Sequence, residues 1–257
     1  MTTSLARTID VFLSPAELEM ERKRGFVGAT CVVIDVLRAT SVIVTGLANG
    51  AHGYVPVEDI ADAVALYRIH PHYLLGGERD GLRITAHQSG GVEFHLGNSP
   101  REHSRARVEN QTIITTTTNG TRALKACAGA DTILAGSFLN LSATVKWLLT
   151  NKVEHVVLVC AGTGEALALE DVLAAGAFCD ALSVDGCGWE LSDSARVAMG
   201  CFRTSIGKLA SAVSGARNAR RLLSNPELLE DVEVCLRADS IPVVAAMTSD
   251  GVIRKLG

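Results

Sequence analysis

One short segment places a carboxylate, an arginine and two hydroxyl groups together at the end of an apolar run. Asp35 directly follows the run at residues 31–34, and Arg38, Thr40 and Ser41 come next, where a helical pattern begins. The carboxylate suits a hard cation such as Mg²⁺. The arginine, together with the amide groups of a helix start, suits an oxyanion. The same residue types also form ordinary helix N-termini with a surface ion pair, so this segment alone leaves a functional site and a structural cap equally open.

Three more strand-like segments end in polar clusters. The clusters are Glu78 with Arg79; Asn119, Gly120, Thr121 and Arg122; and Cys160 with the later Glu170 and Asp171. In an open α/β sheet, functional groups collect beyond the carboxyl ends of parallel strands, so we expect the four clusters to meet at one edge. Acids there would bind a divalent metal, and arginines would bind phosphate, carboxylate or sulfonate bidentately. Ordinary turns are polar too, but four such clusters favour a functional site.

The run of threonines before Asn119 and Gly120 allows two interpretations. Asn-Gly is a strong turn signal and predicts a tight connection. Amide and hydroxyl groups around Gly120 would also form an oxyanion nest at a helix start. The sequence contains no G-x-x-x-x-G-K-[ST], and no G-x-G-x-x-G follows a strand, so neither a P-loop nor a dinucleotide cofactor is predicted.

Two further features keep a functional and a structural alternative open. Cys160 would be a nucleophile if nearby cations or helix amides stabilised its thiolate, but a buried structural thiol is favoured. The cluster of Arg217, Arg220 and Arg221 is interpreted as a solvated helix face, and contact of one of them with a polyanionic substrate is the less favoured alternative.

Alternating strand and helix patterns predict an α/β protein. Strands are expected at residues 8–13, 30–34, 54–57, 73–75, 112–117, 132–135, 155–160 and 241–245, with helices in most intervals between them. This alternation predicts a three-layer α/β/α architecture with a mixed, largely parallel sheet. We expect residues 1–257 to form a single α/β domain, with two closely packed subdomains as the variant.

Composition narrows the class of protein. Apolar residues make up 47% of the 257 residues and the net charge is −4, which argues against a general nucleic-acid binder. No apolar run approaches the roughly 18 residues that span a bilayer, and the N-terminus does not resemble a signal peptide. The seven cysteines include no C-x-x-C pair and are typical of reduced thiols. We expect a cytoplasmic protein without membrane or nucleic-acid partners; alanine-rich helices leave a homodimer or higher homo-oligomer open.

Five motifs, taken in order, resemble the 2-phosphosulfolactate phosphatase family. They are Asp35-Val-Leu-Arg-Ala-Thr-Ser, Gly77-Glu-Arg, Leu96-Gly-Asn-Ser-Pro, Thr116-Thr-Thr-Asn-Gly-Thr-Arg, and Cys160-Ala-Gly with Glu170-Asp171. The resemblance implies the family's own α/β fold and Mg²⁺-dependent hydrolysis of (R)-2-phospho-3-sulfolactate to 3-sulfolactate and phosphate. That reaction is a step of coenzyme M biosynthesis. The implied partner is a small, anionic, phosphorylated substrate.

The resemblance also suggests roles for individual residues. Asp35 and Glu78 would hold Mg²⁺, with Glu170 or Asp171 as a third ligand or as the base for water. Three arginines would bind the anionic groups of the substrate, and small polar groups would cradle the phosphoryl oxygens. The substrate-binding residues expected are Arg38, Thr40, Ser41, Arg79, Asn98, Asn119, Gly120, Thr121 and Arg122.

The sequence leaves alternatives open for the chemical step and for the substrate. Direct attack by metal-bound water is favoured, while a phosphoenzyme on Asp35 or Cys160 remains the alternative. A phosphatase for another phosphorylated hydroxy acid differs only in substrate. A non-catalytic binder of phosphorylated or sulfonated acids would use the same arginines, but carboxylates beside an anion would then be unfavourable. Their number favours a metal-dependent enzyme.

Overall fold

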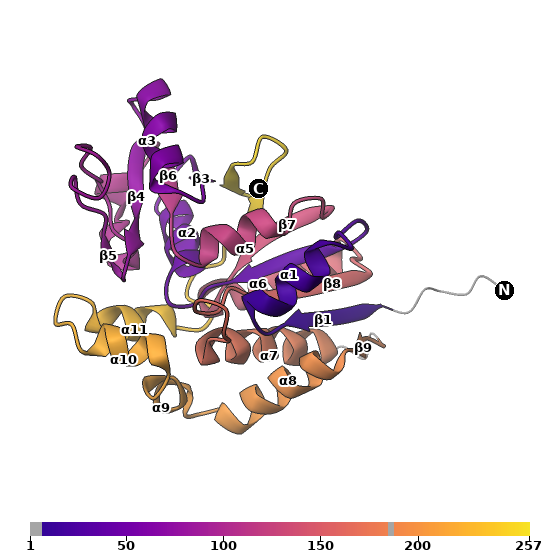
Figure 1. The fold of residues 1–257 in the computed structure, drawn as a ribbon. Coiled ribbons are helices and arrows are strands. Elements are labelled where there is room, and N and C mark those ends of the chain that lie inside the picture. The colour runs from indigo at the N-terminus through magenta and orange to yellow at the C-terminus, as the bar shows by residue number, and fades with distance from the viewer. Residues whose placement is uncertain (1–6, 185–187) are drawn as a thin grey trace.

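The computed structural model describes residues 7–184 and 188–257, and its central feature is a sheet that runs through the whole molecule (Figure 1). Its strands within the described residues are β1 (Thr8–Phe12), β2 (Thr30–Ile34), β3 (Gly53–Pro56), β4 (Leu74–Arg79), β5 (Leu82–Arg83), β6 (Thr112–Thr116), β7 (Thr132–Gly136), β8 (His155–Cys160), β9 (Glu190–Leu191), β10 (Ala245–Met247) and β11 (Ile253–Lys255). Their spatial order is β5-β4-β6-β3-β11-β10-β7-β2-β8-β1-β9.

Helices connect most of these strands. They are α1 (Pro15–Arg22), α2 (Ala39–Ala48), α3 (Ile60–Ile69), α4 (Arg105–Val108), α5 (Gly120–Ala126), α6 (Leu141–Thr150), α7 (Leu169–Ser183), α8 (Asp193–Ser205), α9 (Leu209–Ser214), α10 (Arg217–Leu223) and α11 (Leu229–Cys235), with 3₁₀ turns η1 (Pro100–Glu102) and η2 (Phe138–Asn140). None of those in the described residues combines the length and apolar character that crossing a bilayer requires.

The structure confirms the α/β class and the mixed, largely parallel sheet, but its strands form two parallel groups. One group is β4-β6-β3, and the other is β7-β2-β8-β1-β9. The C-terminal hairpin β10–β11 lies between them and makes three successive antiparallel pairings. Across the sheet the two groups therefore run in opposite senses.

The twist of the sheet nevertheless brings the carboxyl ends of both groups to one place. Adjacent strands rotate by about 20–25°, and Figure 1 shows β4 and β6 lying crosswise to β8. The ends of both groups point toward α10 and α11, in the lower left of that view. The expected single edge is thus replaced by a corner between two crossed strand groups.

The last predicted strand was misplaced. It was expected at residues 241–245, but β10 begins only at Ala245. Pro242 cannot donate to a ladder, and the Ile241 amide donates instead to the Leu139 carbonyl. Strand β11 was not predicted, because three residues of mixed polarity carry no periodic signal.

Helices cover both faces of the sheet, as the side chains of β2 illustrate. Val32 and Ile34 belong to a core shared with α7, whereas Cys31 and Val33 belong to a core shared with α2 and α5. This division follows the two-residue period of a strand. Helix α2 is buried over most of its length, because its core also includes residues of β3 and β6 from the other strand group. It therefore fixes the position of the β2–α2 turn from both sides.

Candidate active site

The corner between the strand groups contains a cavity of about 100 Å³. Its walls come from the β2–α2 turn, the β4–β5 turn, the loops after β6 and β8, and helix α10. The lining residues are Asp35, Leu37, Arg38, Glu78, Asp80, Gly81, Asn98, Thr118, Asn119, Thr163, Asn218, Arg221 and Leu222. Asp35, Arg38, Glu78, Asn98 and Asn119 had been predicted as site residues, and the fold brings these five together.

Asp35 has a carboxyl group that is nearly buried, with 8% of the residue exposed. Its Oδ1 accepts a hydrogen bond of 3.2 Å from the Ala39 amide. The α5 start approaches closely, because a Cβ on Gly120 would lie 2.7 Å from Asp35 Oδ2. Burial raises the pKa of Asp35 to about 7, and the charges of Glu78 and Glu170 add to the rise, against the lowering effects of the Ala39 amide and Arg38. The surroundings of Asp35 therefore disfavour the ionised form of its carboxyl group.

Glu78 is fixed by three donors. Its Oε1 accepts from the amide and the hydroxyl of Thr118, at 2.8 and 2.9 Å, and its Oε2 accepts from the Gly81 amide at 2.7 Å. These bonds join the β4–β5 turn to the loop after β6. Glu78 thus presents a preoriented carboxylate to the cavity.

The neighbouring acids Glu170 and Asp171 have different hydrogen-bond partners. Asp171 accepts from the amides of Val36 and Gly162, at 2.9 and 3.0 Å, and so joins the loops after β2 and β8. Glu170 accepts from Asn218 Nδ2 at 2.6 Å, while its Oε2 is buried without a hydrogen-bond partner. Burial raises the pKa of both carboxyl groups. Glu170 is therefore the acid with an uncommitted oxygen, and Asp171 is a structural link.

The three arginines expected to bind substrate lie in different environments. Arg38 lines the cavity but is only 3% exposed, and its Nη1 donates to Asp231 Oδ2 at 2.7 Å. Arg79 donates to the carbonyls of Glu78 and Glu58 and to the Thr116 hydroxyl. Both guanidinium groups are thus engaged by the protein.

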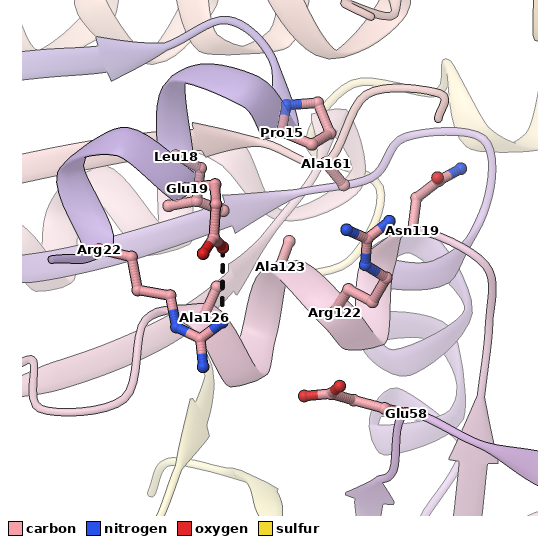
Figure 2. Close-up of a pocket in the computed structure, with 10 residues that line it drawn as sticks. All are labelled: Pro15, Leu18, Glu19, Arg22, Glu58, Asn119, Arg122, Ala123, Ala126 and Ala161. Carbon is pink, nitrogen blue, oxygen red and sulfur yellow. Dashed lines mark hydrogen bonds and ion pairs between the residues drawn. The ribbon is translucent and has the colours of Figure 1, made fainter. Parts of the chain in front are cut away.

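Arg122 lies outside this cavity. It lines a neighbouring cavity of about 60 Å³ between α1 and α5, where Figure 2 shows it with Glu58 and Arg22. Its Nη2 lies 3.5 Å from Glu165 Oε1. Asn119 lines both cavities. The placement of Arg122 argues against contact with the same small ligand.

Several predicted hydroxyl groups hold turns rather than face the cavity. Thr40 Oγ1 donates to the Asp35 carbonyl, Ser41 Oγ to the Val36 carbonyl, and Thr121 Oγ1 to the Thr117 carbonyl, at 2.8–2.9 Å. A hydroxyl that follows a strand end readily makes such local bonds. These three residues shape the site through the backbone.

Cys160 belongs to the hydrophobic core. Its residue is fully buried among side chains of the β-sheet and α7. Burial raises the pKa of its thiol well above the ordinary range, and the nearby charge of Asp171 adds to the rise. Because the thiolate is the nucleophile, this environment argues against a covalent role.

Sequence reasoning did not propose several cavity residues, among them Asp80, Thr118, Thr163 and Asn218. Asn218 contacts Glu170 across 48 residues of sequence, so no local pattern reveals the pair. Arg221 had been noted only as a less favoured substrate contact. Its place in the cavity wall follows from how α10 packs beneath the strand ends (Figure 1).

The donor set suits a hard cation in chemistry, although it is not a closed cage. Within residues 7–184 and 188–257, no three His, Cys, Asp or Glu side chains converge closely enough to hold a metal ion by themselves. Mg²⁺ in proteins is held through one or two carboxylates, with water and substrate phosphate completing its shell. The charges of Glu78 and Glu170 disfavour the charge of Asp35, and a cation would relieve this repulsion. The residues present therefore fit such an ion.

Comparison with known proteins identifies the family of this chain. Residues 14–250 match the family model described as 2-phosphosulpholactate phosphatase. A probable 2-phosphosulfolactate phosphatase of Symbiobacterium thermophilum is 36% identical over 228 residues, 88% of this chain and 94% of that protein. One of Thermotoga petrophila is 39% identical over 226 residues, with 88% and 92% covered. Another, of Caldicellulosiruptor saccharolyticus, is 44% identical over 153 residues, 58% of this chain and 60% of that protein. The chain therefore belongs to the 2-phosphosulfolactate phosphatase family.

Proposed function

We propose that this chain hydrolyses (R)-2-phospho-3-sulfolactate to 3-sulfolactate and phosphate, as a phosphoric monoester hydrolase. The observation that carries the proposal is the buried Asp35 carboxyl group, which lines the cavity at the corner of the strand ends together with Glu78; the charge of Glu170 also acts on it. Such an arrangement has no structural advantage, because burial and the charges of Glu78 and Glu170 disfavour the ionised form of Asp35. In a phosphoryl-transfer site, by contrast, such acids would hold a cation beside the phosphoryl group. The chain also matches the family over most of its length.

Magnesium is part of the proposal. Asp35 and Glu78 are the side chains that would hold Mg²⁺; of the two roles expected for Glu170, third ligand or base for water, we propose the base. When bound, the ion would neutralise phosphoryl charge and orient the ester for in-line displacement.

The chain itself would supply the base for the attacking water. Glu170 is the candidate, because Asn218 fixes one of its oxygens at 2.6 Å and leaves Oε2 unpartnered. Burial raises the pKa of Glu170, which strengthens it as a proton acceptor. The burial of Cys160 argues against a phosphoenzyme on its thiol, and the role of Asp35 as a ligand would leave direct attack by water as the favoured route.

Phosphate release is the measurement that tests the proposal. 2-Phosphosulfolactate and phospholactate are each assayed with Mg²⁺ and with excess EDTA. Mg²⁺-dependent release with a strong preference for the sulfonated compound is expected. Equal rates on both would indicate a broader phosphatase for hydroxy acids. No release from either compound, with tight binding retained, would indicate a non-catalytic binder and contradict the proposal.

The biological setting of the reaction is also proposed. Six cysteines in the described part of the chain are free thiols, as in a reducing compartment, which supports a cytoplasmic location. A product that carries a sulfonate and a free hydroxyl would serve coenzyme M biosynthesis. Whether the chain acts as a monomer or as a homo-oligomer is measured by light scattering.

A further inference from the structure

The cavity is rich in acids and poor in available cations. Asp35, Glu78 and Asp80 line it, and the only arginines in its wall are Arg38 and Arg221 within the described residues. The substrate of the proposed reaction carries a phosphate, a carboxylate and a sulfonate. Binding it in a wall of carboxylates requires cationic groups with free hydrogen-bond donors.

Arg38 is largely committed to the protein. Its Nη1 donates to Asp231 at 2.7 Å, and its Nη2 donates to the Gly81 carbonyl at 2.6 Å. Asp231 is fully buried and also accepts from the Ser99 hydroxyl at 2.7 Å. Breaking this network to release Arg38 would leave a buried charge without its partner, which is strongly unfavourable.

Arg221 is the cavity arginine whose guanidinium remains available. Its side chain is 51% exposed, and its Nη2 lies 3.8 Å from Asp80 Oδ1, a side chain that is 95% exposed. An ion pair this exposed and this long contributes little to stability. A ligand anion would therefore replace Asp80 as the partner of Arg221 with little loss.

The backbone of the β4–β5 turn lies against Arg221. Gly81 has a φ of +74°, and a Cβ on it would lie 3.4–3.5 Å from the Nη2, Cζ and Nε atoms of Arg221. The guanidinium thus rests against a residue without a side chain. The carbonyl of the same Gly81 accepts from Arg38, so both cavity arginines lie beside one residue of the β4–β5 turn.

We propose that Arg221 is the specificity-determining residue that binds the sulfonate of the substrate; this inference rests on the proposed function. The phosphate and the carboxylate are both attached to the second carbon, while the sulfonate extends from the third. The phosphoryl group belongs beside Asp35, so the sulfonate is the group left for the wall formed by α10 and the β4–β5 turn. A planar guanidinium matches two oxygens of such a group.

Two substitutions on α10 form a matched pair for the test. Arg221→Gln removes the charge in the cavity wall. Arg220→Gln removes an exposed charge from the preceding residue, which does not line the cavity. KM and kcat are measured for 2-phosphosulfolactate and for phospholactate, which lacks the sulfonate. For Arg221→Gln we expect KM for the sulfonated substrate to rise roughly 10- to 100-fold, the loss of one charge-assisted contact. KM for phospholactate should change little, and Arg220→Gln should change neither.

The binding of 3-sulfolactate and of lactate by calorimetry separates this inference from the proposed function. A selective loss of 3-sulfolactate binding in Arg221→Gln supports the inference even if the wild-type chain releases no phosphate. An equal loss of binding for 3-sulfolactate and lactate, or no loss for either, would overturn it. Arg221→Lys keeps the charge but not the planar guanidinium. If Arg221→Gln is folded but binds the sulfonated ligand weakly, Arg221→Lys should recover part of the preference for that ligand.

Discussion

At the scale of single residues, the carboxyl group of Asp35 combines near-complete burial with two acidic neighbours. The pKa of about 7 that results means that this carboxyl group is only about half ionised at neutral pH, because the site disfavours its charge. Active sites commonly contain such destabilising groups. A cation and a phosphoryl group would both reduce the repulsion, which connects the local electrostatics to binding.

The Asp35→Asn variant tests that connection. We expect phosphate release to fall by at least about 10²-fold, because a charged ligand of the reaction centre is lost. The thermal midpoint in EDTA should stay the same or rise, since a buried charge that Glu78 and Glu170 disfavour is removed. Full activity in a folded Asp35→Asn protein would remove this residue from the mechanism.

The adjacent acids of α7 provide a second prediction. Glu170→Gln should lower turnover with little change in the free energy of unfolding, because the uncommitted Oε2 is its functional atom. Asp171→Asn should destabilise the fold by about 1–3 kcal/mol, since an amide NH₂ would face a backbone donor of Val36 or Gly162.

Activity assays and urea denaturation of both variants measure the difference. If Asp171→Asn keeps full stability and loses turnover while Glu170→Gln loses only stability, the two roles are reversed.

At the scale of elements, α11 holds the cavity wall from outside the sheet. Its Asp231 accepts from Arg38 after β2 and from Ser99 and Arg101 near η1. These groups lie 130 or more residues from Asp231 along the chain. One buried carboxylate thus joins the C-terminal helices to the β2–α2 turn and to the loop before η1.

Asp231→Asn should therefore be costly. Removing the charge that balances buried Arg38 is expected to destabilise the protein by about 3–5 kcal/mol. Glu230→Gln is the matched control: its exposed pair with Arg101 should contribute about 0–1 kcal/mol. Chemical denaturation of the two variants checks the contrast, and equal small losses would show that Arg38 finds another partner.

At the scale of the whole molecule, α2 and the loop before α4 pack the crossed strand groups together. His103 is buried in that loop; the Tyr54 hydroxyl of β3 lies 2.7 Å from its Nδ1, and the Gly97 carbonyl lies 3.3 Å from its Nε2. Burial lowers the pKa of His103 from 6.5 to about 4. The folded protein consequently keeps this imidazole neutral over a pH range in which the unfolded chain protonates it.

This difference predicts a loss of stability in acid. Between pH 6.5 and about 4 the unfolded state binds the extra proton, so the free energy of unfolding should fall by up to about 1.4 kcal/mol per pH unit from this group. His103→Gln should have a shallower pH dependence than the wild type over the same range. His87→Gln, at an exposed position, should leave the slope unchanged; equal slopes in all three proteins would contradict the assignment to His103.

The expectation of one domain stays a prediction at this scale. The continuous sheet supports it, and so does α2, which packs against strands of both groups. Coincident unfolding transitions by circular dichroism and by tryptophan fluorescence would agree with a single cooperative unit.

The sequence by itself determined the elements that depend on local rules. The apolar and β-branched runs at 30–34 and 155–160 are strands with the predicted bounds. Ser14 caps α1 through the Glu17 amide as its Ser-Pro-x-Glu pattern predicts. Strand ends in polar clusters also located much of the cavity, because functional side chains follow strands in α/β proteins.

Only the tertiary structure decided which of those side chains are available. Whether Arg38 faces a ligand or Asp231 depends on a partner 193 residues away, and the Asn218–Glu170 bond depends on how α10 packs. The strand order, with a C-terminal hairpin between two opposed groups, depends on pairings of three residues that have no periodic signature. Contacts between distant segments are selected by burial and charge compensation in the assembled fold, and a local pattern contains neither quantity.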